Sequence, residues 1–225
     1  MLDAPLLAEH NCWFGGGTAI VLANGEFRES VDIDFLVSDP KSYRELRQMV
    51  RDHGLDALAT REVELGRTPS VDGHGIRTSV LVAGTAIKFE IIHEGRIDLD
   101  TPSPDDEICG LRILTRTDQV ATKLLANDDR WADTSTFSRD LIDLAMMRPK
   151  STALKAGARK AVDAYGKTVG ESLSKAVAYL QDRPQRLDDY IRALKIDAPR
   201  AVVWQSIRQL SARCSKIEGL GRGSD

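Results

Sequence analysis

The sequence lacks the features that mark membrane, secreted and zinc-thiolate proteins. No run approaches the roughly 18 apolar residues that a membrane span needs, and the N-terminus has neither the basic start nor the apolar core of a secretion signal. The three cysteines, Cys12, Cys109 and Cys214, lie far apart and form no C-x-x-C or Cys/His ligand pattern. We therefore expect a cytoplasmic protein with no membrane contact, whose thiols are buried or unreactive.

Basic residues are outnumbered in the first part of the chain and acidic residues in the last part, which the overall net charge of −3 conceals. Residues 1–147 contain 15 Lys and Arg against 26 Asp and Glu, a net charge of −11, whereas residues 148–225 contain 16 against 8, a net charge of +8. Such asymmetry indicates a part that binds a polyanion, joined to a part with another role. The alternative is a helical region whose exposed face simply carries many cations.

Apolar periodicity along the 225 residues predicts an α+β protein. Strands are expected at residues 11–14, 31–37, 59–65, 76–82 and 85–92. Helices are expected at residues 18–23, 41–54, 117–125 and 137–147, and almost continuously from residue 152, with breaks at 166–170, 183–184 and 198–199. Residues 5–12 fit a short helix or a lead-in strand, residues 93–110 an exposed loop, and residues 219–225 a disordered tail. Thr117 and Ser138 are candidate N-caps.

A glycine run comes shortly before two aspartates in an apolar strand, within residues 13–37, WFGGGTAIVLANGEFRESVDIDFLV. Glycines ahead of a helix let the backbone approach a phosphate group, although this run matches neither the Walker nor the dinucleotide-binding pattern. Asp32 and Asp34 project from the same face of a strand, where two like charges are unfavourable unless a cation or protons occupy the site. Mg²⁺ fits this pair of carboxylates, because a nucleotide's phosphates can complete its coordination shell. The alternative is an edge strand whose acidic face is solvated.

The strand at residues 85–92 offers a third acid. Lys88 and Glu90 share one of its faces, while apolar residues line the other. If this strand lies beside the one that carries Asp34, Glu90 could complete a three-carboxylate site that holds two metals. The alternative is a plain Lys–Glu surface pair.

Several motifs together resemble one enzyme family. Gly16-Gly17-Thr18-Ala19, then Arg28, Ser30 and Asp32-Ile33-Asp34-Phe35, resemble the G-G-[TS]-A … R-x-S-x-D-I-D signature of minimal nucleotidyltransferases of the AbiEii and MenT toxin type. The segments TDQVATKLLA and SRDLIDL, which begin at Thr117 and Ser138, resemble that family's K-L-x-A … R-D-x-x-D-L segment. The similarity spans most of residues 13–147, and the combination is far more specific than any single motif.

The resemblance implies a role for each matching residue. Asp32 and Asp34 would bind the metal, with Glu90 as a third ligand, and Lys123 would contact the triphosphate. Asp140 would lie in the same pocket as a candidate base, although Asp143 is an alternative to it. By the resemblance, Gly16, Gly17 and Thr18 would bind the nucleotide's phosphates. Arg28, Ser30 and Lys88 complete our candidate nucleotide-binding set. Two departures are an extra glycine, Gly15, and a long spacer between Lys123 and Arg139.

The resemblance also implies an architecture and a reaction. Residues 1–147 would form a nucleotidyltransferase domain, a small mixed sheet flanked by helices, and residues 148–218 a basic helical bundle that receives an RNA backbone. The enzyme would use Mg²⁺, or Mn²⁺ in its place, to transfer a nucleoside monophosphate from an NTP to an RNA hydroxyl. The acceptor would be the 3′ end of tRNA, and the enzyme would be a toxin that a partner antitoxin neutralises.

Other functions fit parts of the same pattern. One is a nucleotidyltransferase that modifies a small molecule such as an aminoglycoside, or a protein side chain. Another is a catalytically silent NTP-binding or interaction module. We interpret His93 as a structural or exposed histidine, and Trp13 and Trp204 as core or platform residues rather than base-stacking groups.

Overall fold

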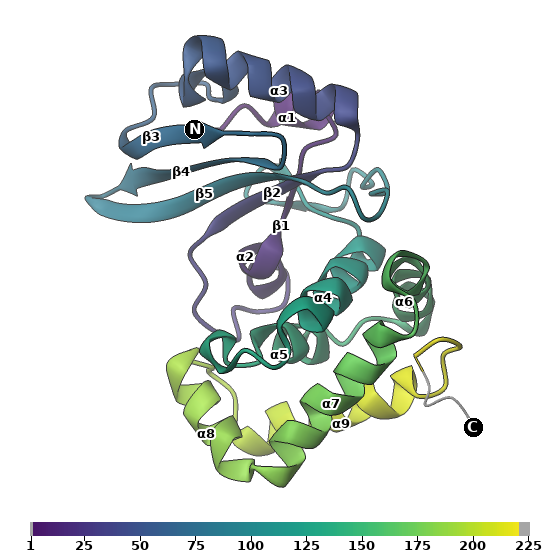
Figure 1. Cartoon of the computed structure of the whole chain (residues 1–225). Helices are drawn as coiled ribbons and strands as arrows, with labels where there is room; N and C mark the ends of the chain where they lie inside the picture. The colour runs from purple at the N-terminus through teal and green to yellow at the C-terminus, as the bar shows by residue number, and fades with distance from the viewer. Residues whose placement is uncertain (1, 221–225) are drawn as a thin grey trace. The chain divides into compact units, whose positions relative to one another are not determined.

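The computed structural model describes residues 2–220, which divide into two compact units (Figure 1). The first unit contains the chain up to Ala19 together with Ser30–Thr115. The second contains Ile20–Glu29 together with the chain from Arg116 onward. Of the predicted tail at residues 219–225, residues 221–225 lie outside the described part. Among the described helices, none has the length and apolar composition that crossing a bilayer requires.

A mixed sheet forms the centre of the first unit, as the sequence predicts. Within the described residues it has five strands in the order β1-β2-β5-β4-β3. Neighbours β2 and β5 run parallel, and the other neighbouring pairs run antiparallel. The strands are β1 (Trp13–Gly15), β2 (Ile33–Val37), β3 (Leu65–Val71), β4 (Gly75–Val82) and β5 (Thr85–His93).

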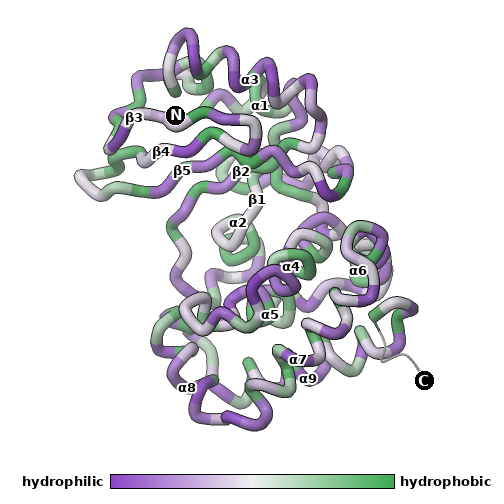
Figure 2. Tube along the Cα trace, in the orientation of Figure 1, coloured by the Kyte–Doolittle hydropathy of each residue, from purple (hydrophilic) through white to green (hydrophobic). Residues whose placement is uncertain are grey.

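Helix α3 (Pro40–His53) covers one face of this sheet. Hydrophilic and hydrophobic residues alternate along it (Figure 2), as expected for a helix with a single buried face. The Asp39 carboxylate caps its start by accepting a hydrogen bond from the Ser42 amide (2.7 Å), and Gly54 follows its last turn. Tyr43 stacks on His93 of β5, with ring centroids 4.7 Å apart. This contact supports the interpretation of His93 as a structural residue.

The two faces of the sheet differ in chemistry. Phe14, Phe35 and Phe89 form a line of contacting rings on the face that α3 covers. Strand alternation directs Asp34 and Glu90 to the opposite face. Trp13 is buried there with Leu36 and Leu114, which confirms Trp13 as a core residue.

Two predictions in the first unit were wrong. Residues 59–65, predicted as a strand, follow a 3₁₀ helix, η1 (Leu55–Leu58). They contain only an isolated bridge at Ala59 and non-regular chain until strand β3 starts at Leu65. Strand β3 lies at an exposed edge, contains Gly66 and Pro69, and pairs with register shifts, so it lacks apolar alternation.

The loop predicted at residues 93–110 is also more ordered than expected. It contains strand β6 (Glu107–Ile108), which pairs with β7 (Leu111–Arg112) through a turn in which Cys109 and Gly110 both have positive φ. The Glu94 carboxylate is buried and accepts hydrogen bonds from the Arg96 guanidinium. The N-terminal segment forms a helix, α1 (Ala4–Glu9).

The second unit is helical throughout. Its helices are α4 (Arg116–Arg130), α5 (Arg139–Met146), α6 (Ser151–Tyr165), α7 (Thr168–Asp182), α8 (Pro184–Ala193) and α9 (Arg200–Cys214), with the short η2 (Thr134–Thr136) before α5. Helices α4 and α6 approach so closely that a Cβ on Gly157 would lie 2.5 Å from the Thr117 carbonyl oxygen. The compact units therefore divide the chain at Thr115, ahead of the predicted boundary at residue 147, because α4 and α5 pack with the later helices.

Neither predicted N-cap acts through its side chain. Helix α4 begins at Arg116, so Thr117 lies inside its first turn rather than at the cap. Ser138 occupies the cap position of α5, but its backbone is left-handed and its side chain makes no capping hydrogen bond. In both cases the predicted helix is present and only its start differs.

The segment from Ile20 to Glu29 reaches the second unit through helix α2 (Gly16–Leu22), which continues directly from β1. The Phe27 carbonyl accepts a hydrogen bond from the Asp197 amide (2.9 Å), and the Glu29 amide donates one to the Leu194 carbonyl (3.3 Å). Early and late parts of the chain are thus joined within this unit.

The cysteines match the prediction of unreactive thiols in part. Cys12 and Cys214 are buried and unpaired, and burial raises the pKa of Cys214 to about 12. Cys109 is exposed in the β6–β7 turn.

Candidate active site

The turn between β1 and α2 consists of glycines at positions where side chains would collide. Gly16 has a φ of +67°, and a Cβ there would lie 2.3 Å from Oδ2 of Asp34. A Cβ on Gly15 would lie 2.6 Å from Cδ1 of Leu36. Glycine therefore lets α2 start directly against the Asp34 carboxylate. Gly15, which the family signature does not include, has a packing reason.

The first turn of α2 also brings two predicted nucleotide-binding hydroxyls together. Thr18 Oγ1 lies 2.8 Å from Ser30 Oγ, and the Thr18 side chain is buried. Gly17 lies between Gly16 and Thr18 in the same turn and is half-buried. The structure thus places Gly17, Thr18 and Ser30 close together, and their role toward a nucleotide stays a prediction.

A row of residues across the sheet passes through Asp34. Gly15 of β1 and Glu90 of β5 are its register partners on either side. Asp32 lies immediately before β2, two residues from Asp34, so extended backbone places both carboxylates on one face. Both aspartates are half-buried. The parallel pairing of β2 with β5 is the arrangement that would bring Glu90 beside the aspartates.

The Glu90 carboxylate forms ion pairs with two basic side chains. Its Oε2 lies 2.5 Å from Nζ of Lys88, and its Oε1 lies 3.5 Å from Nε of Arg77. Arg77 is the register partner of Glu90 on β4 and also pairs with Asp72 (3.1 Å). The sequence did not identify Arg77, because an arginine in an alternating strand gives no sign of which carboxylate it will face.

Asp32 and Asp34 are the carboxylates at this edge of the sheet whose chemistry fits a divalent cation. Across the described residues, no three Asp, Glu, His or Cys side chains gather into a metal-binding group, because Glu90 turns toward Lys88 and Arg77. Mg²⁺ is usually held by one or two carboxylates together with phosphate oxygens, which Asp32 and Asp34 satisfy. The absence of a side chain at Gly16 lets its backbone lie directly against the Asp34 carboxylate. Glu90 as a third ligand stays a prediction.

A second charged cluster lies in the helical unit. Nζ of Lys123 is 2.9 Å from Oδ1 of Asp140 and 2.7 Å from Oδ2 of Asp143. Arg130 binds Asp140 through Nε (2.7 Å) and Nη2 (3.0 Å). Arg28 binds Asp143 through Nε (2.7 Å) and Nη2 (2.8 Å), a bidentate pair that is almost fully buried. Three cations thus surround two carboxylates, and the cluster carries one excess positive charge.

These contacts determine the protonation of the cluster. Burial alone would raise the pKa of Asp140, but attraction and hydrogen bonds from Lys123 and Arg130 outweigh it and hold the pKa well below its usual range. Burial would likewise lower the pKa of Lys123, but Asp140 and Asp143 raise it above its usual value. Asp140 is therefore a firmly ionised carboxylate and a weak base at neutral pH. This geometry argues against the predicted role of Asp140 as a base while its cations remain in place.

We expect the lowered pKa of Asp140 to appear in the acid unfolding of the protein. A carboxyl group whose pKa is lowered by folding stabilises the folded state above its unfolded pKa, about 3.9, and this contribution is lost as the pH falls through the folded pKa. In Asp140→Asn, the number of protons taken up on unfolding below pH 4 should fall by about one. The measurement is urea unfolding between pH 2 and 7. If the free energy of unfolding changes with pH at roughly the same slope in both proteins, the lowered pKa of Asp140 is contradicted.

The predicted site residues are divided between the two units. Gly16, Gly17, Thr18, Ser30, Asp32, Asp34, Lys88 and Glu90 belong to the first unit, and Arg28, Lys123 and Asp140 belong to the second. Arg130 was missed, although a signal existed: it lies seven residues after Lys123 on α4, two helical turns along the same face.

Comparison with known proteins identifies the family. The family model of the AbiEii nucleotidyl transferase toxin of type IV toxin–antitoxin systems matches residues 2–211. Two solved structures are similar, each with a TM-score of 0.47 and each covering 93% of this chain: a candidate nucleotidyltransferase from H. pylori, 19% identical over 87% of that chain, and JHP933 from Helicobacter pylori, 18% identical over 88%. No curated protein matches the sequence. Because the family model covers nearly the whole chain, this protein belongs to the AbiEii nucleotidyltransferase toxin family and is a nucleotidyltransferase.

Proposed function

We propose that this nucleotidyltransferase moves a nucleoside monophosphate from an NTP to a hydroxyl of RNA, with the 3′ end of tRNA as acceptor, and that a cognate antitoxin neutralises it. The observation that carries the proposal is the close approach of Gly16 to Asp34, which places the glycine turn at the start of α2 against a carboxylate that can hold a cation. The attacking hydroxyl would form a bond to the α-phosphorus, and pyrophosphate would leave.

Different residues of the first unit would bind the cation and the phosphates of the nucleotide. Asp32 and Asp34 would hold Mg²⁺, or Mn²⁺ in its place. The bound cation would neutralise the phosphates and lower the pKa of the attacking hydroxyl. The backbone of Gly16 and Gly17 and the hydroxyls of Thr18 and Ser30 would bind phosphate oxygens. Lys88 would meet the nucleotide's negative charge once its carboxylate partner Glu90 is engaged elsewhere.

The charge of the second unit supports RNA as the acceptor. This unit contains 21 Lys and Arg against 16 Asp and Glu, a net charge of +5, and residues 148–225 alone carry +8. Cations that neutralise an RNA backbone release counterions, so affinity falls as salt rises. A small-molecule or protein acceptor has no need of such a surface.

A labelled-nucleotide assay tests the proposal. The purified protein is incubated with each α-labelled NTP, Mg²⁺ and total RNA, and we expect label on RNA in the size range of tRNA. Periodate oxidation of the RNA removes the 3′-terminal hydroxyls and should abolish labelling. Label on periodate-treated RNA would contradict the 3′ end as acceptor, and label only on protein or on no macromolecule would contradict an RNA acceptor.

We expect Gly16→Ala to reduce transfer by roughly 100-fold, because displacing a catalytic carboxylate by about 1 Å can cost that much. The new Cβ would require Asp34 to move, since the two would otherwise lie 2.3 Å apart. Gly84→Ala is the matched control: Gly84 also has positive φ (+78°) in the first unit, but a Cβ there meets nothing within 4 Å. It should cost about 1–2 kcal/mol of stability and leave the transfer rate unchanged. Equal transfer rates in the two variants would show that the position of Asp34 is unimportant.

A further inference from the structure

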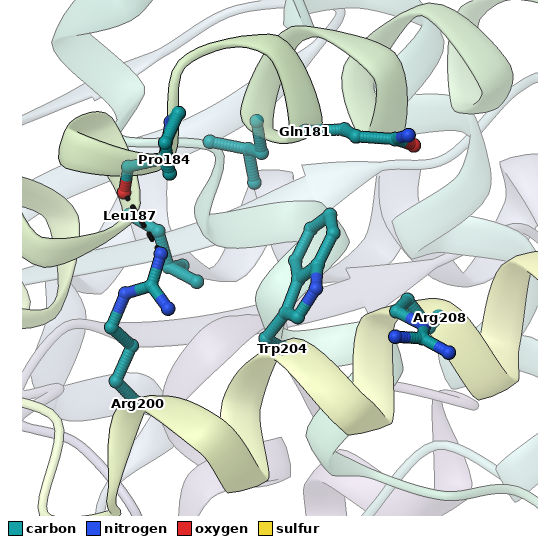
Figure 3. A pocket seen from close by; sticks show the side chains of 7 residues that line it. Gln181, Pro184, Leu187, Arg200, Trp204 and Arg208 are labelled. Atoms are coloured by element: carbon teal, nitrogen blue, oxygen red, sulfur yellow. Dashed lines mark hydrogen bonds between the residues drawn. The ribbon is translucent and has the colours of Figure 1, made fainter.

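Helices α7, α8 and α9 enclose a cavity of about 330 Å³ in the second unit (Figure 3). Its floor is apolar and includes the buried Leu180 and Leu187, together with Pro184. One wall is the indole of Trp204, which stands out from α9 into the space (Figure 3). The cavity therefore offers a flat aromatic surface above an apolar base.

The polar groups of this cavity lie at its rim. Arg200, Trp204 and Arg208 are spaced four residues apart on α9, so the two arginines flank the ring on one face of the helix. The adjacent face of α9 supplies the buried core residues, among them Val203 and Ile207. Gln181 lines the cavity from α7, and its side chain extends past the top of the ring (Figure 3).

The two arginines differ in their partners. Arg200 pairs with Asp188 (2.8 Å) and donates a hydrogen bond to the Pro184 carbonyl (3.3 Å). Arg208 is exposed, and within the described residues it has no hydrogen-bond or ion-pair partner. Arg200 is thus fixed in place, whereas the Arg208 guanidinium is available to an anion.

We propose that this cavity binds one unpaired nucleotide of the acceptor RNA, with its base against Trp204 and its phosphate at Arg208. Stacking on an aromatic ring and pairing of the backbone with cations are how proteins hold single-stranded nucleic acid. Gln181 carries both a hydrogen-bond donor and an acceptor for a base edge. A base inside a duplex has both faces covered, so only an unpaired nucleotide can enter. The inference rests on the proposed RNA acceptor and revises the interpretation of Trp204 as a core or platform residue only.

Binding of a labelled RNA hairpin to the full-length protein tests the proposal without requiring turnover. For a hairpin with a single-stranded 3′ overhang, Trp204→Ala should weaken binding by roughly 5- to 100-fold, the range found for loss of one base–aromatic stack. Trp204→Phe keeps a stacking ring and should bind within about threefold of wild type. A blunt-ended RNA duplex of two separate strands has no loop and no overhang, and it should bind all three proteins equally.

Charge variants test the phosphate contact. Arg208→Gln should weaken binding of the overhang hairpin and reduce the slope of log affinity against log salt by about 0.7, the value for one phosphate contact on a single strand. Arg186→Gln removes another exposed arginine, on α8 and outside the cavity, and should leave the slope almost unchanged. Equal slopes in these two variants would overturn the assignment of Arg208.

The outcomes separate this inference from the proposed function. Overhang binding by Trp204→Ala that equals wild type, in a protein with an unchanged melting temperature, overturns the nucleotide cavity even if wild type labels RNA. A free nucleoside monophosphate that competes away the overhang at equal concentration would assign the cavity to mononucleotides instead. Loss of antitoxin neutralisation in Trp204→Ala with RNA affinity intact would assign it to the protein partner. Absence of labelled RNA with wild type overturns the proposed function, whereas the overhang measurement stands on its own.

Discussion

Asp34→Asn is expected to lower nucleotidyl transfer by roughly 1,000-fold, because a bound cation contributes several kcal/mol of transition-state stabilisation and each 1.36 kcal/mol is a factor of ten. The change removes the charge but keeps the size of the side chain beside Gly16. NTP affinity without Mg²⁺ should change little. The measurement is the initial rate of label transfer from an α-labelled NTP to RNA.

The control for this variant is Asp105→Asn. Asp105 is an exposed aspartate of the same unit that lies outside the proposed site. Its replacement removes one negative charge from the same unit, so the transfer rate should stay at the wild-type level. Transfer by Asp34→Asn at more than one-tenth of the wild-type rate, with the fold intact, would contradict the proposed role of Asp34.

Asp143→Asn is expected to destabilise the protein by roughly 3–5 kcal/mol, the usual cost of removing one partner from a buried ion pair. The Asp143 side chain is fully buried, and its loss leaves the charges of Arg28 and Lys123 without their shared carboxylate. The effect concerns the second unit, which contains all three residues. The measurement is the free energy of unfolding from urea titration at neutral pH.

Two further variants serve as controls for the stability measurement on Asp143→Asn. Asp189→Asn breaks the exposed pair between Asp189 and Arg192 and should cost less than about 1 kcal/mol. Arg28→Met combined with Asp143→Asn should cost less than the sum of the two single changes, because both remove the same contact. Additive losses, or an Asp143→Asn protein as stable as Asp189→Asn, would show that the buried pair does not hold the unit together.

The sequence predicted those elements whose signal is local. Helix α3 and strands β4 and β5 follow directly from apolar periodicity, and Gly166 and Pro184 mark where the C-terminal helices end and begin. Strand β3 could not be predicted, because an exposed edge strand needs no apolar face. The start of the second unit was missed because helix packing decides it, and no linker composition marks Thr115.

The residues of the candidate site could likewise be predicted only where their signal is local in the sequence. The aspartates and glycines could be found because they lie close together in the sequence and match a family signature. The pairing of Asp34 with Glu90 depended on a parallel register that only the folded sheet fixes. Arg28 and Asp143 are 115 residues apart, so no local pattern could show that each is the other's partner.

The membership of the segment Ile20–Glu29 in the second unit has a consequence during translation. Arg28 leaves the ribosome long before Asp143, and its neighbour Phe27 hydrogen-bonds to Asp197 near the C-terminus. At about 5–20 residues per second, the ribosome needs roughly 10–30 s to pass from Arg28 to Asp197. The first unit is completed within this interval, once Thr115 has been synthesised, whereas the second unit stays incomplete. A nascent copy of this toxin therefore cannot close its helical unit until Asp197 has been synthesised, which leaves time for a partner to meet the chain before that unit is assembled.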